Sequence, residues 1–120
     1  MSKAEQLQQV LLDLTKSMPE ILSVIVASPD GLLIAERSAG GDANRLAAMA
    51  ATALGLGKRI AAETGLGEVA DINVMGESGY FLVYAIGDKA ALGVLVPQDA
   101  NLGLVRLEAT ETVKNVLEEL

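Results

Sequence analysis

Three short segments of the chain are almost entirely apolar, and this feature restricts the fold more than any other. They are residues 22–28, 80–86 and 90–96, which are rich in Val, Ile, Leu and Ala. A strand covered on one side alternates apolar with polar residues, whereas a strand covered on both sides shows no alternation. We therefore expect one sheet with helices on both of its faces, in three layers.

Three longer segments have helical periodicity: residues 2–18, 43–64 and 102–120. In the first, Ser2 and Glu5 have the S-x-x-E spacing of a capping box, and apolar residues recur at intervals of three and four. Each of the other two follows an Asp or Asn that can act as an N-cap. The sequence therefore predicts a first, a middle and a last helix.

Two further strands complete the predicted sheet. Residues 32–37 follow a Ser-Pro-Asp-Gly turn, and residues 68–75 precede a turn at 76–79 that leads into the next strand. The predicted element order is α-β-β-α-β-β-β-α. A chain of 120 residues suits one domain, so we expect a single α/β (α+β) domain over residues 1–120.

The middle helix carries three stripes when its residues are placed at 100° steps. One stripe is large and apolar: Leu46, Met49, Ala53, Leu56, Gly57 and Ile60. A second is rich in alanine: Ala43, Ala47, Ala50, Ala51, Leu54, Lys58 and Ala61. We expect the large stripe to face the sheet. The alanine stripe is then either a self-association face or a consequence of the high helix propensity of Ala.

The third stripe is polar and consists of Arg45, Ala48, Thr52, Gly55 and Arg59. Residues 43–62 hold three basic groups and no acidic one, although the whole chain has a net charge of −7. A local basic surface on an acidic protein suits an acidic protein partner. We therefore interpret this stripe as the partner-binding site; the alternative is an ordinary solvated helix face.

The composition argues against several classes of function. The chain has no Cys and no His, which removes thiolate nucleophiles, the Ser-His pair and the commonest metal ligands. The Gly55–Arg59 segment lacks the spacing of a phosphate loop. We expect no catalytic residue, no metal, no cofactor and no enzyme activity. An acidic chain with three aromatic residues also argues against nucleic-acid binding. The polar N-terminus and the absence of a long apolar run predict a cytoplasmic protein that does not insert into membranes.

Four stretches of the sequence resemble the roadblock / dynein light chain family, which includes MglB-type proteins. They are residues 19–37 with the Ser-Pro-Asp-Gly turn, the alanine-rich residues 42–63, the strand pair in 69–83, and Asn-Leu-Gly-Leu-Val-Arg-Leu-Glu at 101–108. The resemblance implies a profilin-like antiparallel sheet in the order 2-1-5-4-3, with the long helix alone on one face.

The resemblance also implies a function. Family members form homodimers, or heterodimers with a sister protein, by pairing their long helices and third strands. They regulate or scaffold Ras-like small GTPases without an active site of their own. We therefore expect the alanine stripe to form the dimer interface together with Val69, Asp71, Asn73 and Met75, and a GTPase to bind the polar stripe. A small-molecule sensor of GAF or PAS type is the alternative function, and an enzyme ranks third.

Overall fold

The computed structural model describes all residues, 1–120, and contains the eight elements in the expected order. They are α1 (Lys3–Ser17), β1 (Ser23–Ala27), β2 (Leu33–Ser38), α2 (Ala43–Thr64), β3 (Asp71–Met75), β4 (Gly79–Ile86), β5 (Ala90–Pro97) and α3 (Leu102–Glu119). The boundaries agree with the sequence analysis to within about a residue, with one exception. The sequence predicts a third strand from residue 68, whereas β3 begins at Asp71.

The five strands form one antiparallel sheet in the order β2-β1-β5-β4-β3, as the resemblance implied. The central strand β5 pairs with β1 on one side and β4 on the other, so that Val94 lies opposite both Val24 and Leu82. β2 and β3 each have one neighbour only. The sheet therefore has two free edges.

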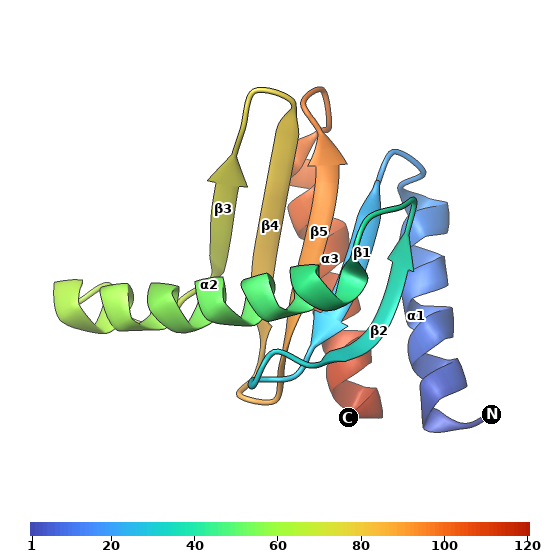
Figure 1. Cartoon of the computed structure of the whole chain (residues 1–120), viewed down its shortest axis with the longest axis horizontal. Coiled ribbons are helices and arrows are strands. Elements are labelled where there is room, and N and C mark those ends of the chain that lie inside the picture. Colours follow the sequence, from blue (N-terminus) through green and yellow to red (C-terminus); the bar gives the residue numbers. More distant parts are fainter.

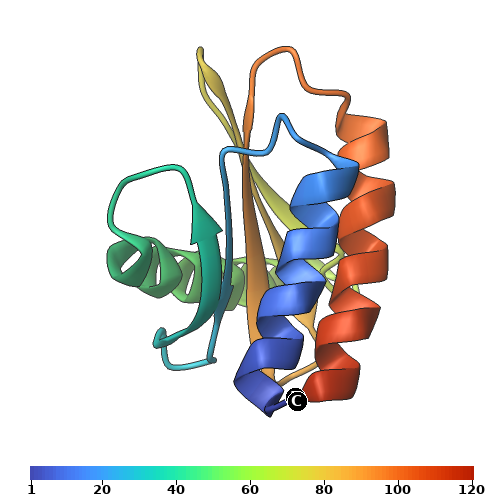
Figure 2. The same cartoon turned by 90° about the vertical axis from the view of Figure 1, so that its right-hand side faces the viewer.

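Helices cover both faces of the sheet, which confirms the three layers. α1 and α3 lie side by side on one face (Figure 2). α2 lies alone on the other face and crosses the strands (Figure 1). Since β1, β4 and β5 have helices above and below, their side chains are apolar in both directions.

Local capping explains where the helices begin and end. The Ser2 hydroxyl accepts a hydrogen bond from the Glu5 backbone N–H at 3.2 Å, and the Ser2 N–H donates to Glu5 Oε1 at 3.1 Å. The hydrogen bond from the Ser2 backbone, and to a smaller extent the Ser2 side chain, lowers the pKa of Glu5. Asp42 and Asn101 cap α2 and α3 in the same way, and Gly65 ends α2 in a left-handed conformation.

The main hydrophobic core lies between the sheet and the α1–α3 pair. It contains 18 buried residues, with fully buried side chains such as Leu11, Met18 and Leu92. The core between the sheet and α2 contains only seven: Ile25, Ala27, Ala47, Ala50, Leu54, Val83 and Ala91. The α2 face of the sheet therefore buries far fewer side chains than the α1–α3 face.

Candidate functional site

The orientation of α2 is the reverse of the one predicted from its stripes. Ala47, Ala50 and Leu54 of the alanine stripe are buried against the sheet, and Ala61 is buried beside the segment that precedes β3. Met49, Leu56 and Ile60 of the large apolar stripe are each more than half exposed. The expectation that the large stripe fills the core was wrong for these three residues, although Leu46 packs against the α2 core. The assignment of the four buried residues to a contact between subunits was wrong as well, because the chain's own residues already cover them.

The physical reason is the shape of the sheet surface under α2. Ile25 and Val83 project from the sheet toward the helix and already supply bulky side chains. Short alanine side chains let the helix backbone lie close above them. Gly57 follows the same rule, because a Cβ at this position would overlap Ile72 Cδ1. Small residues on α2 therefore mark its contact with its own sheet.

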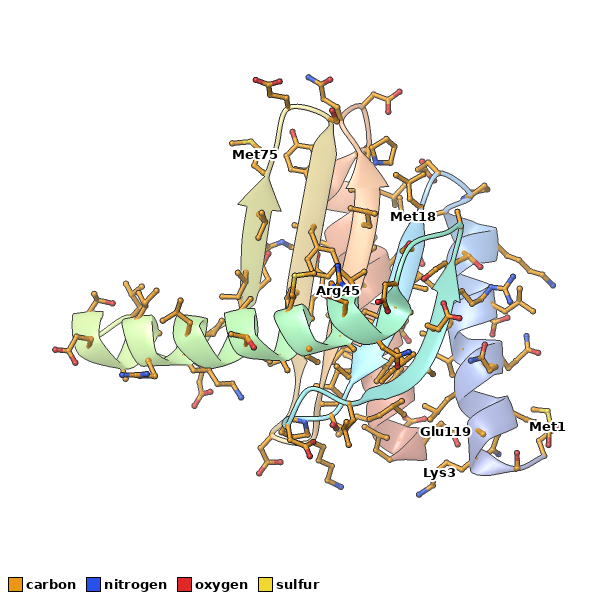
Figure 3. All side chains as sticks on the ribbon, in the orientation of Figure 1. Met1, Lys3, Met18, Arg45, Met75 and Glu119 are labelled. Carbon is orange, nitrogen blue, oxygen red and sulfur yellow. The ribbon has the colours of Figure 1, made fainter.

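The exposed large side chains of α2 continue onto β3. Met49, Leu56 and Ile60 are 52%, 56% and 51% exposed, and on β3 Val74 and Met75 are 54% and 71% exposed. We call Met49, Leu56, Ile60 and Val74 the apolar surface. Met75 has the same strand parity as Asp71, which contacts α3, and therefore faces the other side of the sheet. Figure 3 shows Met75 at the end of β3 that is distant from α2. Soluble monomers rarely expose large contiguous apolar patches, which usually mark interaction sites.

α2 is longer than the sheet beneath it. Its 22 residues span about 33 Å, whereas five strands spaced about 4.8 Å apart span about 19 Å from first to last. Figure 1 shows the C-terminal part of α2 extending beyond β3. Within residues 55–64 only Ala61 is buried. The overhanging part of the helix is covered only in part, because Leu66 and Val69 of the segment before β3 line a hollow with Ile60 and Ala61.

The edge strand β3 has no neighbour on the side of this overhang. Its Gly76 N–H donates to the Gly79 carbonyl at 2.9 Å. Because antiparallel residues alternate between facing the partner strand and facing away, the backbone groups of Asp71, Asn73 and Met75 point to the free edge. A free edge is a template for pairing with another chain.

The predicted partner site lies on the outward side of α2. Its five residues, Arg45, Ala48, Thr52, Gly55 and Arg59, are all exposed. Arg45 lies 3.9 Å from Asp42, and Figure 3 shows its side chain in front of the sheet. Arg59 makes no ion pair. A Cβ added at Gly55 would meet no heavy atom within 4 Å, so nothing inside the chain explains this glycine.

A small hollow of about 200 Å³ separates α2 from the turns below it. Ser28 of the β1–β2 turn, Asp88 of the β4–β5 turn, and Ala51 and Lys58 of α2 line it. Drug-sized ligands usually occupy about 300–1,000 Å³. This hollow is smaller than that range.

The other residues assigned to the dimer interface are placed as follows. Ala43 and Ala51 are half-buried, and Lys58 is exposed on the side of α2 away from the apolar surface. Val69 packs against the α2 core although it precedes β3. On β3, Asn73 and Met75 are exposed. Asp71 accepts two hydrogen bonds from Arg106 of α3. Its role in self-association stays a prediction, as does that of each of the other residues.

Sequence reasoning recognised Met49, Leu56 and Ile60 as one stripe but assigned them to the core. The length of the helix could have revealed that part of this stripe is exposed, because a 22-residue helix is longer than a five-stranded sheet is wide. No sequence pattern predicts the Arg106–Asp71 contact, since the two residues are 35 positions apart.

The fold and the open surface define an α/β protein with a profilin-like sheet, one face of which is covered by a single helix and both edges of which are free. A family profile described as the Roadblock/LC7 domain matches residues 7–96. The chain therefore belongs to the Roadblock/LC7 domain family, which confirms the resemblance.

Individual relatives agree with this assignment. The chain is 36% identical over 115 residues to the uncharacterized protein MJ1340 of Methanocaldococcus jannaschii, and the match covers 95% of this chain and 96% of that protein. A Roadblock/LC7 domain from Streptomyces avermitilis is 26% identical with a TM-score of 0.85, covering 91% of this chain and 92% of that one.

Two more distant structures share the fold. Myxococcus xanthus MglB is 21% identical with a TM-score of 0.88, covering 98% of this chain and 90% of that chain. The LokiProfilin1 complex with rabbit actin contains a chain that is 15% identical with a TM-score of 0.64, covering 100% and 98%. The profilin-like architecture is thereby confirmed. No helix of this chain is both long enough and apolar enough to span a membrane.

Proposed function

We propose that this chain is a non-catalytic, dimeric protein-binding module that regulates or scaffolds a Ras-like small GTPase. Two copies associate through the apolar surface and the free edge of β3, and the GTPase binds the outward stripe of α2. Membership of the Roadblock/LC7 family and the fold shared with MglB support the proposal. GTPase activator is the finer form of this role, and the rate of GTP hydrolysis by the GTPase with and without the chain tests it.

The overhang of α2 beyond β3 is the main observation that supports self-association. A second copy related by a two-fold axis places its own β3 under this overhang and receives the first copy's β3 under its own helix. Such a contact covers Leu56, Ile60 and Val74. It also pairs the free β3 edge of one copy with the free β3 edge of the other. An isologous contact of this kind closes on itself and stops at two subunits.

Sedimentation analysis over a range of concentrations tests the dimer. The wild-type chain should sediment at about twice its 12.4 kDa mass, and Leu56→Arg should shift it toward the monomer because a charge is forced into an apolar contact. Leu107→Arg is the matched control, since Leu107 is 68% exposed on α3, on the opposite face. A monomeric wild-type chain contradicts the proposed dimer.

The GTPase site is carried by the charge and shape of the outward stripe. Arg45 and Arg59 flank the small residues Ala48, Thr52 and Gly55, which leaves a shallow basic surface. Arginine is favoured at interfaces for its planar donor group. The unexplained Gly55 would let a partner approach the helix backbone closely.

Calorimetric titration with purified Ras-like GTPases from the same genome, loaded with GDP or with a GTP analogue, tests this site. Arg45→Glu/Arg59→Glu should weaken binding by at least about tenfold and leave the dimer intact. Lys16→Glu/Lys114→Glu on α1 and α3 is the control with the same change of charge. Equal binding by both variants places the GTPase elsewhere on the molecule.

A further inference from the structure

All side-chain hydrogen bonds in the molecule but two join residues no more than four positions apart. The two exceptions both run from Arg106 of α3 to Asp71 of β3. Arg106 Nη2 donates to Asp71 Oδ1 at 3.0 Å and to Oδ2 at 2.9 Å. This is the one polar side-chain contact between distant segments of the chain.

The contact is placed at the beginning of the free edge strand. Asp71 is the first residue of β3, and its side chain is 13% exposed whereas that of Arg106 is 58% exposed. Tyr84 lies directly opposite Asp71 in the β3–β4 register and is buried. Burial, and to a smaller extent the charge of Asp71, raises the pKa of Tyr84. Asp71 is thus held from α3 and flanked by a buried ring.

Stability alone does not account for this pair. Ion pairs with one well-exposed partner contribute little to folding, because water screens them and ordering long side chains is entropically unfavourable. The two hydrogen bonds to its carboxylate restrict the orientation of Asp71. The backbone N–H and carbonyl of this residue point to the free edge, as the alternation from Gly76 shows.

We propose that Arg106 is a positioning residue for self-association. By holding Asp71 it aligns the first backbone groups of the β3 edge for pairing with β3 of a second copy of this chain. The role rests on the proposed dimer. It links α3, which is on the opposite face of the sheet from α2, to the edge at which the second copy binds.

The test compares Arg106→Met with Lys114→Met. Both remove one exposed cation from α3 and keep an apolar stem, but Lys114 makes no ion pair. Arg106→Met should weaken the dimer about fivefold for each pair, hence about 25-fold for the two pairs of a symmetric dimer. Lys114→Met should leave the dissociation constant unchanged. The charge-exchanged variant Arg106→Asp/Asp71→Arg should recover most of the affinity.

Hydrogen exchange separates positioning from general stability. In dilute, monomeric protein, Arg106→Met should accelerate exchange of the β3 amides and not those of β2, the other edge strand. Equal dissociation constants for Arg106→Met and Lys114→Met overturn the positioning role and leave the dimer standing. Equal acceleration at both edges also overturns it, because the pair would then act through overall stability. A wild-type chain that never dimerises overturns both proposals.

Discussion

The two faces of the sheet are built from similar apolar strands but are closed to very different degrees. On one face α1 and α3 bury a core of 18 residues, while on the other α2 alone buries seven and leaves large apolar side chains in water. One helix cannot cover a face that two helices cover on the other side. The difference supports the proposal that the first face holds the fold together and that a second copy of the chain completes the other.

The sharpest contrast is between two leucines. Leu11→Ala removes a fully buried side chain from the closed face and should lower the free energy of unfolding by about 2–5 kcal/mol. Leu56→Ala on the open face should change it by less than about 0.5 kcal/mol. Urea unfolding of dilute, monomeric protein measures both. Equal losses would show that the α2 face is already closed within one chain.

A small residue enlarged under α2 tests which stripe faces the sheet. Ala50 is fully buried, so Ala50→Leu should separate helix from sheet and lower the free energy of unfolding by about 1–3 kcal/mol. Ala62→Leu, at an exposed position on the same helix, is the control and should have little effect. Had the alanine stripe been free, as its sequence suggested, the two variants would behave alike in thermal unfolding.

The two glycines inside α2 differ in the same way, because Gly55 has open surroundings and Gly57 faces Ile72 of the sheet. Gly55→Ala should raise the free energy of unfolding by up to about 1 kcal/mol, since its surroundings are open and Ala favours helix. At Gly57 the new methyl group meets the end of Ile72, which must move, so Gly57→Ala should gain less or lose stability. Thermal unfolding of the two variants decides this. If Gly55 serves partner binding, Gly55→Ala should also weaken the GTPase complex.

The smallest effect concerns Tyr84 on the closed face. Its pKa is raised first by burial and then by the Asp71 charge, while Arg106 opposes the rise. Asp71→Asn should therefore lower the pKa of Tyr84 and Arg106→Met should raise it. Ultraviolet titration of the tyrosines measures both shifts. Shifts of the same sign in the two variants would contradict this electrostatic origin.

The raised pKa of Tyr84 also predicts how the free energy of unfolding depends on pH. A group with a raised pKa in the folded state contributes stability below its unfolded value, about 10 for Tyr, and loses it as the pH rises through the folded value. Unfolding free energy should accordingly decline above about pH 10, and the decline should be steeper in Arg106→Met. Denaturant titrations at alkaline pH measure it.

Much of the architecture follows from local patterns. The capping box of Ser2 and Glu5 and the caps at Asp42 and Asn101 all have the predicted geometry. Strands that are apolar on both faces required helices on both sides. These signals act over a few residues, and their physical causes are the same in any fold. The start of β3 was less predictable, because Val69 packs against α2 without pairing in the sheet.

The sequence by itself determined the elements, their order and the need for two helical layers, because periodicity and capping are properties of neighbouring residues. The tertiary structure alone decided which stripe of α2 is buried and which edge Arg106 holds. Both stripes of α2 contain apolar residues, so composition did not separate them; the bulk of Ile25 and Val83 on the opposing sheet did, by favouring small residues above them. Arg106 and Asp71 meet only because the fold packs α3 against β4, the strand that pairs with β3.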